Sequence, residues 1–201
     1  MASYIQMCTN DQPLIDAILA GDTQSFSGIV DRYKDLVFTL ALRMLKHREE
    51  AEEASQDTFI KVFRSLNRFR GESKLSTWIY KVAYHTCLDR LKKQKREQHV
   101  VAIDEYTENQ VKTIDNALDR MQKEERKDAI QDCLKLLPSA DSALLTLFYF
   151  EDLSLDEIAK IVDLTANNVK VKLFRGRKKL TGILRDRLAP ELIADYERER
   201  K

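Results

Sequence analysis

Acidic side chains gather at residues 49–57, where five carboxylates have the chemistry to hold catalytic metal ions. Glu49, Glu53 and Asp57 share one helical face, because residues four apart lie one above another. A two-metal site also needs ligands from a second segment, and nothing in the sequence pairs with this one. The three cysteines and three histidines lack the spacing of a zinc site or a disulfide framework. We therefore expect no metal, no cofactor and no enzymatic activity.

Basic side chains form two blocks, although the net charge of the chain is only +1. Residues 58–96 carry a net charge of +9 and residues 166–185 carry +7, whereas residues 97–132 between them carry −5. A local field attracts phosphate more than net charge does. The pattern predicts two contacts with a polyanion. For either block alone, a solvated helix face is the alternative interpretation.

Residues 153–180 contain two helix starts in quick succession. Ser154 and Glu157 form the pattern of a capping box, and Thr165 can cap a second helix. Asp163 stands at the turn where glycine is usual, and aspartate tolerates a left-handed backbone. This predicts a helix-turn-helix, whose second helix fits the major groove. Its base-reading and phosphate-binding face would comprise Thr165, Asn167, Asn168, Lys170, Val171, Lys172, Phe174, Arg175, Arg177 and Lys178, with Lys179 and Arg185 holding further phosphates.

Aromatic and basic residues are mixed within residues 69–96. Unpaired bases stack on rings, and cations follow the backbone, so this mixture is typical of a single-strand site. Phe69, Tyr80 and Tyr84 are candidate contacts here. We assign Phe59, Phe63 and Trp78 to packing.

Low glycine and proline content, five and three residues, favours an all-α fold over a sandwich or barrel. Apolar spacing predicts helices over 22–44, 49–66 and 76–96, and again from 113 up to Pro138. We expect two small helical lobes joined by a flexible linker, with the helix-turn-helix in the second. No apolar run is long enough to span a membrane, so we do not expect membrane insertion. We expect a cytoplasmic location.

The chain contains a series of short motifs in a fixed order: Gly21-Asp22 with Phe26 and Tyr33, Ala51-Glu52-Glu53-Ala54-Ser55-Gln56-Asp57-Thr58-Phe59, Phe69-Arg70-Gly71-Glu72-Ser73, Ser76-Thr77-Trp78 and Leu137-Pro138. In this order the motifs resemble those of the extracytoplasmic-function (ECF) group of bacterial RNA polymerase sigma factors. The resemblance implies sigma domain 2 over 1–96, an acidic linker over 97–112, sigma domain 4 over 113–185 and a tail over 186–201. It implies partners as well: core RNA polymerase, promoter DNA as duplex and as melted single strand, and an anti-sigma factor.

The resemblance also implies which residues contact each partner. Core polymerase would bind Glu53, Gln56, Asp57, Phe59 and Ile60. The minus-10 element would bind Phe69, Arg70, Gly71, Glu72, Ser73, Lys74, Lys81, Tyr84, His85, Arg90 and Lys93, with a flipped base held by the loop. His85 stands where the family commonly has asparagine. The helix-turn-helix face given above would read the minus-35 duplex.

One alternative shares the second lobe: a stand-alone helix-turn-helix transcriptional regulator. Such a regulator is usually a dimer, because two half-sites supply the affinity. It would not need the acidic helix and aromatic loop of the first lobe. The two interpretations therefore differ over residues 49–96: a sigma factor would use them, whereas a stand-alone regulator would not need them.

Overall fold

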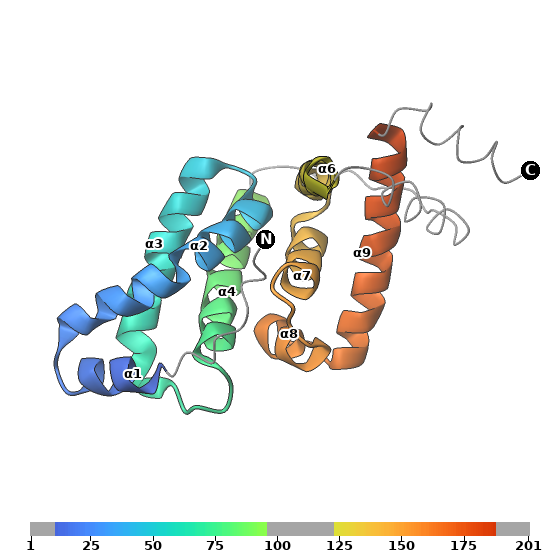
Figure 1. Cartoon of the computed structure of the whole chain (residues 1–201). Helices are drawn as coiled ribbons and strands as arrows, with labels where there is room; N and C mark the ends of the chain where they lie inside the picture. The colour runs from blue at the N-terminus through green and yellow to red at the C-terminus, as the bar shows by residue number, and fades with distance from the viewer. Residues whose placement is uncertain (1–10, 96–122, 188–201) are drawn as a thin grey trace, which may run out of the picture.

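The computed structural model describes residues 11–95 and 123–187, and its regular elements are all helical (Figure 1). The first lobe, residues 11–95, and the second lobe, residues 123–187, lie side by side. The all-α prediction is confirmed. The elements of the first lobe are α1 (Gln12–Leu19), the short 3-10 helices η1 (Thr23–Ser25) and η2 (Leu66–Arg68), α2 (Phe26–Leu45), α3 (Arg48–Ser65) and α4 (Leu75–Lys95). Those of the second are α6 (Lys123–Leu136), α7 (Ser139–Tyr149), α8 (Leu155–Val162) and α9 (Ala166–Arg187).

The first lobe is built around α2, which buries the apolar stripe that the sequence predicts. Ile29, Val37 and Met44 on this stripe are almost completely buried, and α2 packs against both α3 and α4. Asp22 caps the short helix η1 that precedes α2, because its Oδ1 accepts a hydrogen bond from the backbone N–H of Gln24 at 3.1 Å. Helix α1, which we did not predict, adds Ile15 and Ile18 to the same core.

The second lobe contains the predicted helix-turn-helix as α8 and α9. The capping box is present: Ser154 Oγ accepts from the Glu157 N–H at 3.2 Å, and Glu157 Oε2 accepts from the Ser154 N–H at 3.0 Å. Helix α8 ends at Asp163, whose left-handed backbone has φ 53°. Thr165 Oγ1 then accepts from the N–H of Asn168 at 3.3 Å. The aspartate therefore fills the role that glycine usually has in this turn.

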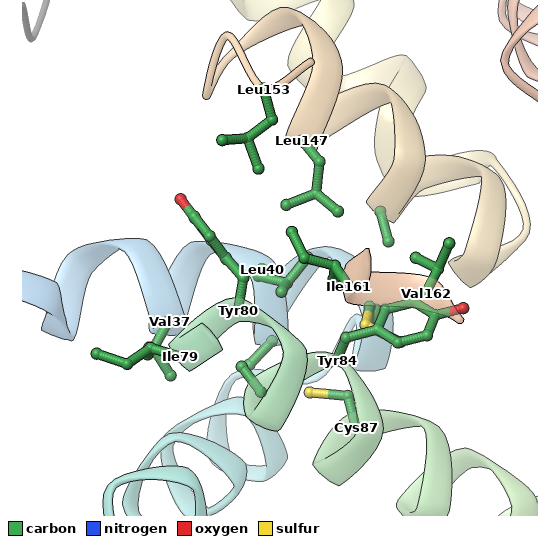
Figure 2. Close-up of a cluster of buried hydrophobic side chains, with 14 of the residues drawn as sticks. Val37, Leu40, Ile79, Tyr80, Tyr84, Cys87, Leu147, Leu153, Ile161 and Val162 are labelled. Atoms are coloured by element: carbon green, nitrogen blue, oxygen red, sulfur yellow. The ribbon is translucent and has the colours of Figure 1, made fainter. Parts of the chain in front are cut away.

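The two lobes share one hydrophobic core, although they are separated in sequence. Helix α4 packs against α8, and α2 packs against α7. Figure 2 shows Leu40 and Tyr80 of the first lobe in one cluster with Leu147 and Ile161 of the second. Polar contacts support this packing, since Lys46 Nζ donates to the backbone oxygen of Leu137, just beyond the end of α6. The predicted linker, 97–112, lies outside the described residues.

No described helix is both long and apolar enough to cross a membrane. Helix α9 continues to Arg187, beyond the segment 153–180 in which the sequence predicts the helix-turn-helix. The reason is packing: Thr181 and Leu184 are buried, and Leu184 belongs to a small cluster with Cys133 of α6. The added turns therefore pack α9 against α6 within the second lobe.

Candidate nucleic-acid and protein-binding surfaces

The exposed side of α3 carries an apolar patch formed by Ile60 and Phe63. The side chains are 48% and 39% exposed, respectively. Assigning Phe63 wholly to packing was therefore wrong, although its ring meets that of Phe26 edge-on at a centroid distance of 5.0 Å. Phe59 is half-buried, with its ring 6.5 Å from Phe26, and Gln56 is exposed. An apolar patch of this kind suits a protein partner more than a nucleic acid.

The carboxylates of α3 are partly engaged within the fold. Arg90 of α4 bonds Asp57, and its Nη1 donates to Glu53 Oε2 at 2.9 Å. These two hydrogen bonds raise the pKa of Arg90, with that to Asp57 the stronger influence. The described residues contain no group of three His, Cys, Asp or Glu side chains arranged to hold a metal ion. Asp57 and Glu53 thus connect α3 to α4, which spacing along one helix could not reveal.

The loop at residues 69–74 projects between α3 and α4. Gly71 has φ 70°, a conformation that favours glycine, and its neighbours Arg70 and Glu72 are exposed. Phe69 is half-buried, and its ring lies 5.5 Å from that of Trp78. Ser73 is also half-buried. The loop therefore exposes the charged side chains of Arg70 and Glu72, next to the aromatic pair of Phe69 and Trp78.

A groove between α3 and α4 is lined by residues of the first basic block. Its walls include Lys61 and Arg68 on one side and Trp78, Lys81 and His85 on the other. Lys61 and Arg68 were missing from our single-strand candidates. Both belong to the basic block, and Lys61, Ser65 and Arg68 are spaced to share one helical face, which is the signal that could have found them. The groove brings cations beside an indole ring, as single-stranded nucleic acid requires.

The middle of α4 is covered by α8. Tyr80 is 3% exposed and Tyr84 is 9% exposed. Lys81 bonds the carboxylate of Asp163, and His85 Nε2 lies 3.0 Å from Asp163 Oδ2. The hydrogen bond from Lys81 lowers the pKa of Asp163, and burial raises that of Tyr84. Of the remaining predicted residues on α4, Lys93 is exposed and Arg90 is engaged as described above.

Helix α9 lies on the side of the second lobe away from the first lobe (Figure 1), and most residues of its predicted base-reading face are exposed. Val169 and Leu173 on the opposite face are buried in the hydrophobic core. Lys178 is half-buried, and its ammonium lies 5.0 Å from the centre of the Phe174 ring. Lys179 Nζ lies 2.7 Å from Asp141 Oδ2, so its expected phosphate contact competes with an internal ion pair. The exposed residues are Thr165, Asn167, Asn168, Lys170, Val171, Lys172, Phe174, Arg175 and Arg177.

Two family models match the chain in the order that the lobes follow. Residues 29–97 match Sigma-70 region 2, and residues 127–180 match Sigma-70, region 4. The ECF RNA polymerase sigma factor SigW of Bacillus subtilis is 33% identical over 178 residues, covering 86% of this chain and 95% of SigW. The ECF RNA polymerase sigma-E factor of Escherichia coli K12 is 31% identical over 176 residues, covering 85% of this chain and 92% of that factor. The chain belongs to the ECF group of RNA polymerase sigma factors, which direct transcription initiation and are not enzymes.

Solved structures share the fold. CnrH in complex with the cytosolic domain of CnrY aligns with a TM-score of 0.58 at 16% identity, covering 89% of this chain and 99% of that one. The sigma factor RpoE from Bartonella quintana, in complex with the anti-sigma factor NepR, aligns with a TM-score of 0.61 at 15% identity. The alignment covers 82% of this chain and 99% of that one. A stand-alone regulator would not require the region 2 match, so we set that alternative aside.

Proposed function

We propose that residues 1–96 act as sigma domain 2 and residues 113–185 as sigma domain 4, connected by an acidic linker over 97–112 and followed by a tail over 186–201. Domain 2 binds core polymerase and the minus-10 element, and domain 4 binds the minus-35 element. One observation carries this division of roles. The same chain has an exposed, predicted base-reading face on α9 and a basic, aromatic groove in the first lobe. Two DNA contacts on one chain raise the effective concentration of the second contact once the first has formed.

Core polymerase binds the exposed side of α3 through Gln56, Phe59 and Ile60, with Glu53 and Asp57 at its edge. The exposure of Ile60 supports this assignment, because a partner would remove it from water. Asp57 is a poor first mutation, since a change there also breaks the Arg90 ion pair.

Gel filtration with bacterial core polymerase tests the contact with an Ile60→Glu variant. We expect the unmodified chain to co-elute with polymerase and the variant to elute alone, because a buried unpaired carboxylate would be strongly unfavourable at the interface. The matched control is Leu19→Glu on α1, which adds the same charge at another exposed apolar residue. Unimpaired co-elution of Ile60→Glu would remove this face from the interface, and failure of the unmodified chain to co-elute would argue against the function itself.

The minus-10 strand binds the loop and α4. Phe69 and the loop residues Arg70, Gly71, Glu72, Ser73 and Lys74 hold the flipped base, while Lys81, Tyr84, His85, Arg90 and Lys93 follow the strand. The groove that adjoins Lys81 and His85 supports this path, since it adds the cations of Lys61 and Arg68. The minus-35 duplex binds the exposed face of α9, where asparagine and arginine side chains match the donor and acceptor patterns of base edges.

An anti-sigma factor is a further proposed partner. One structural neighbour was solved with an anti-sigma factor, NepR, and this supports the assignment for a chain of the same fold. We also propose a cytoplasmic location, where the polymerase and the promoter are found.

A further inference from the structure

Helix α8 lies over the part of α4 that is proposed to hold the melted strand. Tyr80 and Tyr84 of α4 join one buried cluster with Leu153, Ile161 and Val162 of the second lobe (Figure 2). Rings that stack on bases must be open to them. Both tyrosines are almost completely buried in this arrangement.

The polar rim of this contact pairs the same surface with carboxylates. Asp163 bonds Lys81 and lies 3.0 Å from His85 Nε2. Lys74 Nζ lies 3.2 Å from Glu157 Oε1. Lys160 Nζ donates to the backbone oxygen of Glu72 at 3.3 Å, which ties α8 to the loop. Asp163 therefore provides an anionic oxygen where a strand phosphate would meet Lys81 and His85.

The duplex-reading face does not share this cover. Asn167, Lys170 and Arg175 are exposed on α9. The structure thus leaves one proposed DNA surface open while the other is occupied by part of the same chain.

We propose that the second lobe is an intramolecular competitor for the melted strand: α8, with Asp163 in the position of a phosphate, must leave α4 before single-stranded DNA binds there, whereas duplex binding by α9 needs no such opening. The proposal rests on the proposed function of α4. The apparent affinity for single strands is then the intrinsic affinity reduced by the fraction of open molecules. Loss of the Asp163 contacts increases that fraction.

The test uses the full chain with two matched variants. Asp163→Asn removes the competing charge and retains a side chain that tolerates the left-handed backbone. Asp152→Asn is the control, because Asp152 is also exposed with a left-handed backbone, φ 50°, and lies in the turn between α7 and α8. Both variants change the net charge equally. Circular dichroism checks that each variant keeps its helical content.

Binding is measured by fluorescence anisotropy with two probes, a random-sequence single-stranded DNA of about 20 nucleotides and its duplex form. Exposed ion pairs contribute at most about 1 kcal/mol, so we expect Asp163→Asn to bind single strands about three- to fivefold more tightly than Asp152→Asn. The duplex affinities of the two variants should agree within about twofold. Small-angle X-ray scattering should also give a larger radius of gyration for Asp163→Asn than for Asp152→Asn.

Three results would overturn the proposal. Equal single-strand affinities for the two variants would show that Asp163 does not compete. An equal gain on single strands and duplex would show that the removed charge acts on DNA in general. If neither the unmodified protein nor either variant binds single strands, α4 is not their site, and both the minus-10 assignment and this proposal are wrong. Co-elution with polymerase tests the remaining function separately.

Discussion

Two lysines on α9 should respond differently to the same substitution: loss of Lys172 should change DNA binding, and loss of Lys179 should change stability. Lys172 is exposed, with no carboxylate partner among residues 11–95 and 123–187, whereas Lys179 is paired with Asp141 at 2.7 Å. Each phosphate contact contributes about −0.9 to the slope of log affinity against log salt concentration. If Lys172 holds a phosphate, Lys172→Ala should reduce the slope by about 0.9, which is about 3.5-fold in relative affinity between 50 and 200 mM salt.

Lys179→Ala should leave the slope unchanged. Its effect should instead be a loss of stability of up to about 1 kcal/mol, because Asp141 is left without its partner and is only 15% exposed. Thermal unfolding measures this loss.

The assay is fluorescence anisotropy of a random-sequence duplex, titrated at several KCl concentrations, since the phosphate contribution does not depend on sequence. The full slope should reach about −3.6 if four exposed cations each meet one phosphate. These are Lys170, Lys172, Arg175 and Arg177. Equal slope changes for Lys172→Ala and Lys179→Ala would refute the argument, because the internal ion pair would then have no influence on DNA binding. If Lys172 reads a base instead, its loss should cost about 1 to 3 kcal/mol at a cognate promoter.

Three further predictions concern stability and reactivity. Burial raises the pKa of Glu151, which lies beside the Tyr80 hydroxyl, so the folded protein loses stability as pH rises from the ordinary carboxyl range through that raised pKa. Glu151→Gln should therefore raise the melting temperature at pH 8 but not at pH 4, and an equal effect at both would contradict this. Ile161→Ala should cost about 2 to 5 kcal/mol in denaturant unfolding because Ile161 is fully buried, and a cost below about 1 kcal/mol would be inconsistent with that burial. Burial raises the pKa of the Cys87 thiol to about 12, so iodoacetamide at pH 8 should modify Cys87 only after unfolding, as peptide mass spectrometry would report.

Local rules predicted the helix-turn-helix. The capping box at Ser154 and Glu157 needs only residues three apart, and the left-handed turn at Asp163 needs only the backbone tolerance of one side chain. The buried stripes of α2 and α9 follow from a period of 3.6 residues. These are properties of short segments, and the sequence contains all of the information they require.

Contacts between segments distant in sequence could not be predicted in this way. Helix α4 buries Ile79 and Ala83 as well as Tyr80 and Tyr84, because neighbours cover it on several sides. A helix with buried residues on several faces gives no clear amphipathic signal. The same limit applies to Arg90, whose carboxylate partners lie on α3 more than thirty residues earlier.

The two basic blocks therefore differ in a way that their net charges conceal. In the first block, Lys81 and Arg90 already have carboxylate partners from other helices, so a DNA phosphate that binds there as proposed must displace an internal anion. In the second block, Lys172 and Arg175 meet no such partner within the described chain. Exchange of one anion for another costs less than exposure of a bare charge, because the cation stays paired throughout. This exchange nevertheless makes the proposed strand binding by the first block conditional on rearrangement of the fold, whereas the proposed duplex binding by the second block needs none.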